Sequence, residues 1–245
     1  MGKIDNNITD VIVTTSLTKN FGSKCVLNSV SLNVPKGSVF GLIGRNGAGK
    51  TTFMKILLGF INESSGEMEI LGEKEDFSKV RGKIGSIIET PTFDEDMSAY
   101  HNLKFRGLLI GFDDDNVIND VLKKVGLYED RNKHVKHYSL GMKQRFGIAS
   151  AILGNPEILL LDEPINGLDP VAIKQVREIL EDLSKKGVTI FISSHILGEM
   201  EKIATHYAFI NEGTIIKQIS TEELANSKED LETYFIKLIG GNANE

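Results

Sequence analysis

The sequence predicts an α/β fold with a mostly parallel core sheet, an N-terminal antiparallel β subdomain and an inserted helical subdomain. Nearly continuous apolar runs at 39–43, 158–161 and 188–192 are typical of strands buried on both faces, and a helical pattern joins the last two. The first third of the chain shows short strand patterns separated by turn residues. From about 98 to 153 the apolar spacing is instead helical.

These patterns describe parts of one domain that covers residues 1–245. We expect a core with its β subdomain at 1–88 and 156–245, and a helical subdomain at 89–155. A chain of 245 residues is long enough to bury the interior of one large α/β domain.

The first third alternates strand patterns with turn signals. Pro35-Lys36-Gly37 and Ser64-Ser65-Gly66 are turn sequences, and a helical pattern from about 49 to 60 interrupts the strands. The expected strands cover residues 11–17, 26–34, 38–43 and 67–71.

The later helices are predicted from apolar side chains at helical spacing. In the helical block these are Leu103, Leu108, Leu109, Val117, Val121, Leu122 and Val125. The helix between the last two core strands carries Val176, Ile179, Leu180 and Leu183 on one face. A final stripe, which we expect to dock on the body of the domain, consists of Leu231, Tyr234, Phe235, Leu238 and Ile239.

The triplet Asp113-Asp114-Asp115 is most simply a solvated helix N-terminus, which the helix dipole favours. A metal site at the triplet is the alternative interpretation.

The composition is that of an ordinary globular protein, with 40% hydrophobic and 25% charged residues. A formal net charge of −6, without a Lys/Arg cluster, gives little reason to expect nucleic acid as a partner. A single cysteine, Cys25, and a start at 1–6 without an apolar segment both favour the cytoplasm. No apolar stretch is long enough to cross a bilayer, so any membrane role depends on a partner.

The loop from Gly44 to Thr51 matches the phosphate-binding pattern G-x-x-x-x-G-K-[ST], directly after an expected strand. Glycines let main-chain amides approach a triphosphate, and the following helix adds its positive N-terminal end. This context predicts a P-loop NTPase that binds ATP, with Lys50 on the β- and γ-phosphates and the Thr51 hydroxyl on Mg²⁺. The expected nucleotide contacts come from Gly44, Asn46, Gly47, Ala48, Gly49, Lys50, Thr51 and Thr52.

Two carboxylates, Asp162 and Glu163, follow the apolar strand at 158–161. Ligand sites of open α/β sheets lie at such carboxyl ends of strands. Asp162 therefore fits a Mg²⁺ ligand, and Glu163 fits the base that polarises the attacking water. The alternative is that both residues only cap the strand in solvent.

Further motifs resemble those of ABC transporter ATPases. The sequence from Tyr138 to Arg145 resembles the signature motif of that family, Asn166 to Asp169 resembles its D-loop, and His195 resembles its switch histidine. Together with the phosphate loop and the carboxylates, these motifs cover nearly the whole chain in the family's order. The resemblance implies an ATPase that uses ATP and Mg²⁺ and powers a separate membrane permease.

The family pattern also implies a head-to-tail dimer, expected here as a homodimer, in which Ser139 and Gly141 contact the γ-phosphate held by the opposite subunit. Leu140 and Met142 depart from the common pattern. An ordinary amphipathic helix with a buried face is compatible with the same segment. That buried face would consist of Phe146, Ile148, Ala149 and Ile152.

Two other positions take roles from the resemblance. His195 would hydrogen-bond the γ-phosphate and orient the water, whereas a structural histidine is the alternative. Phe21 stands where the family keeps an aromatic residue that stacks on adenine, and a plain core aromatic is the alternative.

Glu89 stands at the position of the family's Q-loop glutamine, where a carboxylate can also bind Mg²⁺. A glutamate at this position, together with the signature sequence at 140–145, resembles the pattern of the ATPases of bacitracin-resistance and lantibiotic-immunity exporters. This predicts a cytoplasmic subunit, peripheral on the inner face of the cell membrane through its permease. The alternatives are a transporter of another substrate and, less favoured, a soluble ABC ATPase outside transport.

Overall fold

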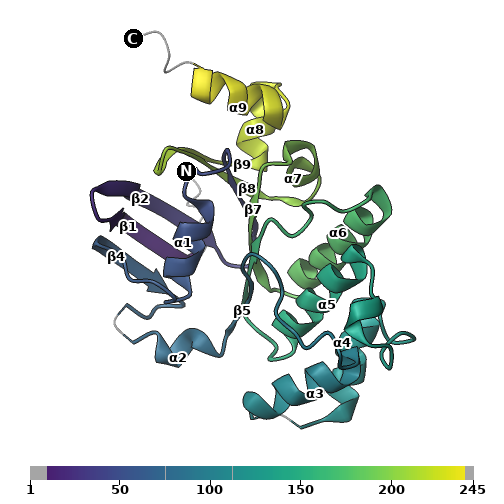
Figure 1. Ribbon diagram of the computed structural model, residues 1–245. Coiled ribbons are helices and arrows are strands. Elements are labelled where there is room, and N and C mark those ends of the chain that lie inside the picture. The colour runs from purple at the N-terminus through teal and green to yellow at the C-terminus, as the bar shows by residue number, and fades with distance from the viewer. Residues whose placement is uncertain (1–9, 75, 112, 241–245) are drawn as a thin grey trace, which may run out of the picture.

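The computed structural model describes residues 10–74, 76–111 and 113–240. The expectation for residues 1–6 lies outside this part of the chain. A three-stranded antiparallel sheet in the order β2-β1-β4 comes first, from β1 (Asp10–Phe21), β2 (Lys24–Pro35) and β4 (Ser65–Ile70). It forms the dark sheet to the left in Figure 1, which confirms the predicted antiparallel sheet.

The first two strands extend closer to their connecting turn than predicted. They join at a tight turn after Phe21, and Phe21 pairs directly with Lys24. The prediction was too short because Thr18, Lys19 and Asn20, which follow Leu17, are polar and none of them is buried. Main-chain pairing, which leaves no hydrophobic pattern, holds this end of the hairpin.

The core sheet has six strands in the order β5-β6-β7-β3-β8-β9. They are β3 (Val39–Ile43), β5 (Ile84–Ile87), β6 (Ile158–Asp162), β7 (Thr189–Ser194), β8 (His206–Asn211) and β9 (Thr214–Ser220). The first five are parallel, and β9 pairs antiparallel with β8 at the edge. The predicted mostly parallel sheet is therefore confirmed.

Side chains along the core strands alternate between two hydrophobic cores. On β6, Leu159 and Leu161 join the core under the later helices, whereas Ile158 and Leu160 join the core shared with the first helix and the three-stranded sheet. In Figure 1 these two groups lie on opposite sides of the core sheet. Burial on both faces explains why the apolar runs are nearly continuous.

Helices connect the strands, and three α-helices and one short 3-10 helix lie between β5 and β6, where helical spacing predicted a helical block. The described helices are α1 (Lys50–Leu57), α2 (Ser78–Arg81), α3 (Ala99–Leu109), α4 (Asp115–Lys124), η1 (Val135–His137), α5 (Leu140–Ile152), α6 (Pro170–Lys185), α7 (Leu197–Ile203), α8 (Thr221–Ser227) and α9 (Leu231–Gly240). The subdomain boundaries at 89 and 155 stay a prediction. Helix α1 ends earlier than predicted because Gly59 follows in a left-handed conformation, with φ of +67°.

The acidic triplet is a helix N-terminus, as first interpreted. The Asp114 carboxylate caps α4 by accepting a 2.8 Å hydrogen bond from the amide of Asn116. Lys104 pairs with Asp115 at 2.8 Å and with Asp113 at 3.6 Å. Among the described residues no cluster of three or more His, Cys, Asp or Glu could hold a metal ion, so the metal alternative is wrong.

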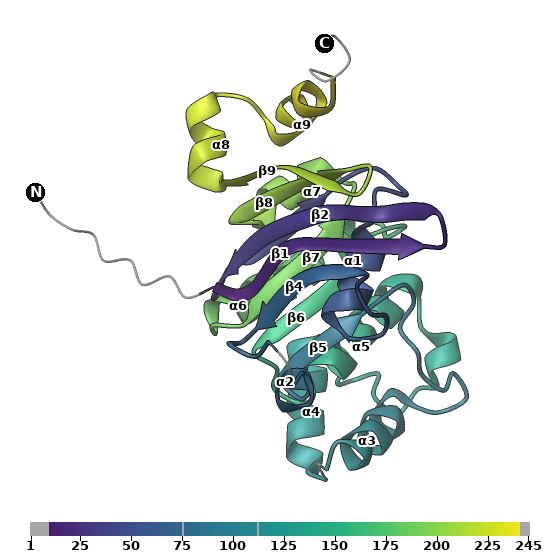
Figure 2. The same ribbon diagram turned by 90° about the vertical axis from the view of Figure 1, so that its left-hand side faces the viewer.

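The C-terminal helix docks on the body, which confirms the prediction. The ring of Phe235 stacks on Phe209 of β8 at 5.9 Å, and Tyr234 lies 5.6 Å from the same ring. Figure 2 shows α8 and α9 above β9, the edge strand of the core sheet. None of the helices in the described ranges is long and apolar enough to span a membrane.

Candidate active site

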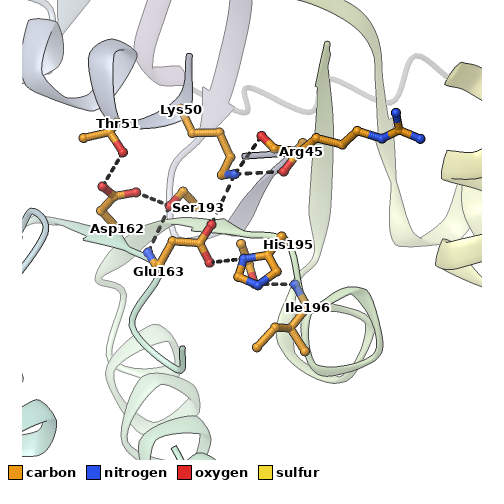
Figure 3. Close-up of polar contacts among 10 residues, drawn as sticks. Arg45, Lys50, Thr51, Asp162, Glu163, Ser193, His195 and Ile196 are labelled. Atoms are coloured by element: carbon orange, nitrogen blue, oxygen red, sulfur yellow. Dashed lines mark hydrogen bonds and ion pairs between the residues drawn. The ribbon is translucent and has the colours of Figure 1, made fainter. Parts of the chain in front are cut away.

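The carboxyl ends of three neighbouring strands bring the predicted site residues together. Strand β7 lies between β3 and β6. Ile43 is in register with Ser194, and Asp162 with Ser193. The loops that follow these strands therefore start from one edge of the sheet, as the close-up in Figure 3 shows.

The loop after β3 depends on glycine at three positions. Gly49 is the N-cap of α1 with φ of +107°, a conformation that L side chains rarely adopt. Gly47 has φ of +81° and borders open space. A Cβ at Gly44 would lie 2.4 Å from the main-chain oxygen of Ile210. The loop is therefore packed against β8 on one side and open on the other.

Lys50 is buried, with 6% of its surface exposed. Its ammonium donates to the main-chain oxygens of Gly44 at 2.8 Å and Arg45 at 3.3 Å, and pairs with Glu163 Oε1 at 3.2 Å. A buried ammonium requires such partners. Three oxygens thus surround the charge predicted to bind the β- and γ-phosphates.

A short hydrogen-bond chain links Thr51, Asp162 and Ser193 (Figure 3). The Thr51 hydroxyl donates to Asp162 Oδ2 at 2.6 Å, and the Ser193 hydroxyl donates to Asp162 Oδ1 at 2.5 Å. Asp162 is 5% exposed. The hydroxyl and the carboxylate are hard oxygen donors, and Mg²⁺ in nucleotide sites uses one or two carboxylates together with phosphates. These residues fit that metal.

Glu163 turns sharply out of β6. Its φ is +50°, an uncommon conformation for a residue with a side chain. Its amide donates to both the main-chain oxygen and the hydroxyl of Ser193, at 3.2 and 3.0 Å. One carboxylate oxygen, Oε2, lies 2.8 Å from His195 Nδ1, whereas the buried Oε1 has no hydrogen-bond donor among the described residues. The 3.2 Å approach of Lys50 to Oε1 is an ion pair without hydrogen-bond geometry.

Both carboxylates are therefore held by hydrogen bonds and ion pairs with neighbouring groups of the site. Asp162 and Glu163 share Ser193, and Glu163 also contacts Lys50 and His195. The alternative that they only cap a strand in solvent is wrong. Ser193 was missed as a linking residue, because nothing in a run of two serines tells which hydroxyl faces the carboxylates.

Two cavities border these groups. The first, of about 360 Å³, is lined by the phosphate loop and Glu163, and also by Lys24 and Val26 from the start of β2. The second, of about 500 Å³, reaches from Asp162 and Glu163 to Glu89 and the start of α5. Lys24 and Val26 were not predicted, because no local pattern tells that the hairpin end faces the loop.

Phe21 is half exposed, so the alternative of a core aromatic is wrong. The ammonium of Lys19 lies 4.9 Å from the centre of its ring, within range of a cation–π interaction. Phe21 stands at the end of the hairpin that carries Lys24 to the first cavity.

Glu89 lies in the loop after β5 in a left-handed conformation with φ of +62°. Its carboxylate pairs with Lys55 of α1 at 2.6 Å and is 63% exposed. In this conformation Glu89 hydrogen-bonds Lys55 and makes no hydrogen bond with Thr51 or Asp162, although it shares the second cavity with Asp162. Its predicted role as a metal ligand therefore requires a change of partner.

Ser139 is the N-cap of α5, and its hydroxyl accepts a 3.2 Å hydrogen bond from the Met142 amide. Gly141 is required by packing, because a Cβ there would lie 2.6 Å from Ala172 of α6. Leu140 between them is 58% exposed. The expected apolar face of α5 is largely buried, with Phe146, Ile148, Ala149 and Ile152 in the core.

The signature segment is anchored by polar groups on its buried side. The Tyr138 hydroxyl donates to the main-chain oxygen of Asp130 at 2.9 Å, and burial raises the pKa of Tyr138 to about 12. Arg145 donates to the main-chain oxygens of Val125 and Gly126, and burial lowers the pKa of its guanidinium. Asp169, in the motif that follows β6, caps α6 through the amides of Val171 and Ala172.

The family of the chain follows from a comparison with family models, in which residues 27–166 match the model described as ABC transporter. The chain belongs to the ABC transporter family. This match covers more than half of the chain and includes the phosphate loop, the signature motif and both carboxylates.

Relatives and solved structures agree with this assignment. The chain is 45% identical over 217 residues to the bacitracin transport ATP-binding protein of Bacillus licheniformis, covering 87% of this chain and 71% of the relative. It is 45% identical over 220 residues to a lantibiotic transport ATP-binding protein of Streptococcus pyogenes, covering 90% and 93%. An ATP-binding subunit of an ABC transporter has a structure with a TM-score of 0.83 at 26% identity, covering 94% and 99%.

This ABC protein is thus an ATP-binding subunit of a transporter, and its activity is ATP hydrolysis coupled to transport. The fold is that of ABC ATPase domains. The predictions of fold class, nucleotide binding and family are confirmed.

Proposed function

We propose that two copies of this ABC ATPase close head to tail around two Mg·ATP molecules and power a separate permease that exports a peptide antibiotic or gives immunity to one. The contacts of Lys50 and Glu163 carry this proposal. Each of these groups is held by partners that a bound triphosphate would replace or complement.

Binding begins at Lys50. Its ammonium is surrounded by two main-chain oxygens and the Glu163 carboxylate. Phosphate oxygens are stronger partners for an ammonium than main-chain oxygens, and the amides of the loop and of the first turn of α1 add further donors. When Lys50 moves to the β- and γ-phosphates, Glu163 loses its ion pair and is left with His195.

Hydrolysis then uses the free oxygen of Glu163. A buried acceptor without a donor costs about 1–3 kcal/mol, so Oε1 favours a water molecule. Glu163 accepts a proton from this water while the water oxygen attacks the γ-phosphorus. The bond between the γ-phosphorus and the β–γ bridging oxygen breaks, which gives ADP and phosphate. His195, 2.8 Å from Oε2, holds the carboxylate in place.

Thr51 and Asp162 would hold Mg²⁺, which when bound neutralises charge on the phosphates. Their mutual hydrogen bond at 2.6 Å places both oxygen ligands side by side. Glu89 is the third candidate ligand, and it would have to exchange Lys55 for the metal.

The second copy would supply Ser139 and Gly141. The amides at the start of α5 are the donors expected for a γ-phosphate. Leu140 and Val171, which begin neighbouring helices, are both strongly exposed apolar residues, as expected for a face that a partner covers. An ATP-binding cassette of the same fold forms a dimer in its structure with ADP and phosphate, which supports this arrangement.

The permease would bind near the end of α1 and the second half of α3, which exposes apolar side chains. Two cavities there share Phe60 and Ser86. Phe60 is strongly exposed, and Arg106 of α3 lines the second cavity. Around Arg106, the end of α3 and the residue after it expose the apolar side chains of Phe105, Leu108, Leu109 and Ile110. Several large exposed apolar side chains within a short segment are typical of an interaction site. A cytoplasmic segment of the permease is the occupant we propose.

The cargo is proposed from the relatives alone. Their printed names give bacitracin transport and lantibiotic transport. Deleting the gene should make the host more sensitive to one of these peptide antibiotics, and unchanged sensitivity to both would favour another cargo. A reading frame for a polytopic membrane protein beside this one would support the permease.

The mechanism is tested by Glu163→Gln. This variant should bind ATP, release almost no phosphate and accumulate as a dimer, because binding is kept and the base is lost. Phosphate release and sedimentation velocity measure the two effects. Glu178→Gln on the exposed side of α6 is the matched control and should behave as the wild type. Wild-type turnover by Glu163→Gln would contradict the assigned role.

A further inference from the structure

The first cavity is bordered by two lysines in different situations. Lys50 lies on the floor, and its charge is taken up by two main-chain oxygens and Glu163. Lys24 lines the same cavity from the start of β2. Its side chain makes no hydrogen bond or ion pair with any residue in the part of the chain that the structure describes.

The charge balance of the cavity follows from this difference. Among the residues that line the cavity, Lys50 and Glu163 are paired and of opposite sign. Lys24 is the remaining charged residue of that lining. The lining of the cavity therefore has an uncompensated positive charge at Lys24, on the side of the hairpin.

The hairpin fixes where along a nucleotide this charge lies. Phe21 and Lys24 are directly opposed across the tight turn. Opposed residues of an antiparallel pair project from the same face of the sheet. Phe21 is the residue proposed to stack on adenine, and Lys50 the residue proposed to bind the β- and γ-phosphates. Lys24 pairs with Phe21 in the hairpin and shares the first cavity with Lys50, so it belongs between these two positions, where the ribose and the α-phosphate would pass.

We infer that Lys24 is a nucleotide-binding residue whose ammonium contacts the α-phosphate. The inference rests on the nucleotide site proposed above and adds one contact to it. An ammonium is a point charge with three donors on a flexible stem, and it suits a phosphate oxygen that is partly hydrated. The residue gives affinity for the nucleotide and takes no part in proton transfer.

A ligand series tests this contact. Binding of ATP, ADP, AMP and adenosine is measured by calorimetry for the tight ligands and by ligand-observed NMR for AMP and adenosine. Lys24→Met keeps most of the aliphatic stem and removes the charge. We expect affinities for ATP, ADP and AMP to fall about 3- to 10-fold, as for one partly hydrated charge-assisted contact, and that for adenosine to stay unchanged.

Two further variants complete the experiment. Lys24→Arg should restore most of the lost affinity, and Lys174→Met, which removes an exposed lysine of α6, should match the wild type. Lys50→Ala is measured alongside and should lose ATP binding. If Lys50→Ala loses ATP but Lys24→Met does not, the nucleotide site stands and the inference about Lys24 is overturned.

The other outcomes also decide. An equal loss for adenosine would mean that Lys24 supports the shape of the hairpin rather than a phosphate, which overturns the inference. A loss for ATP and ADP without a loss for AMP would move the contact away from the α-phosphate and overturn it as well.

Discussion

Ser193→Ala is the substitution that tests the link between the two carboxylates. The Ser193 hydroxyl donates to Asp162 at 2.5 Å and accepts from the Glu163 amide at 3.0 Å, and the residue is fully buried. A hydrogen bond to a charged group contributes about 1.5–3 kcal/mol, so the free energy of unfolding should fall by about 2–3 kcal/mol. The main-chain oxygen at position 193 still accepts from the Glu163 amide, which limits the loss.

The neighbouring serine provides a matched control. Ser194 is equally buried, and its hydroxyl accepts a single 3.0 Å hydrogen bond from the Ile196 amide. Ser194→Ala should therefore cost only about 0.5–1.5 kcal/mol, the value for a neutral hydrogen bond. For a chain of this size, about 2–4 °C in Tm corresponds to each kcal/mol. Ser193→Ala should thus melt several degrees below Ser194→Ala.

Thermal unfolding without nucleotide and steady-state phosphate release are the two assays. We expect Ser193→Ala to lower kcat more than Ser194→Ala, because both carboxylates lose a contact that orients them. Equal melting temperatures for the two variants, or a larger loss of turnover in Ser194→Ala, would refute the reasoning.

Three further substitutions test other parts of the molecule. Burial raises the pKa of Tyr138 to about 12 against about 10 in the unfolded chain. The contribution of this pKa shift to the free energy of unfolding is therefore complete below pH 10 and is lost as pH rises toward 12. The stability of Tyr138→Phe should fall less steeply with rising alkaline pH than that of the wild type, and equal profiles would contradict this. Gly213→Ala should lower both Tm and the ATP affinity measured by calorimetry. A Cβ at Gly213 would lie 2.3 Å from the Val26 oxygen, its φ is +76°, and its amide donates to the Ala48 oxygen of the phosphate loop. A wild-type Tm would argue against this reasoning. Glu89→Gln should change Tm little, since its pair with Lys55 is exposed, but should raise the Mg²⁺ concentration needed for half-maximal turnover; an unchanged Mg²⁺ dependence would remove Glu89 from the metal site.

Much of the fold could be predicted because its main features are local. The apolar runs at β3, β6 and β7 and the phosphate loop are each contained in a few consecutive residues. Strands β5, β8 and β9 were missed. Strand β5 is short and interrupted by Gly85, whereas the apolar residues of β8 and the turn at Gly213 were a readable signal.

The missed parts of the site depend on contacts between distant segments. Ser193 hydrogen-bonds Asp162 across neighbouring strands, and Lys55 of α1 pairs with Glu89 in the loop after β5. Lys24 of the hairpin lines the same cavity as the phosphate loop. Periodicity and motifs describe neighbours along the chain, so they do not reveal such pairings. The family resemblance named Glu89 but not its lysine partner.

ATP affinity of Lys50→Ala, measured against Lys55→Ala from the same helix, tests the central claim most directly. Lys50 is buried among oxygens that we expect phosphate to replace, whereas Lys55 pairs with Glu89 and does not line the first cavity. We predict an affinity loss of about 100-fold for Lys50→Ala, as for a lost charge contact of about 3 kcal/mol, and little change for Lys55→Ala. Wild-type affinity in Lys50→Ala would contradict the account.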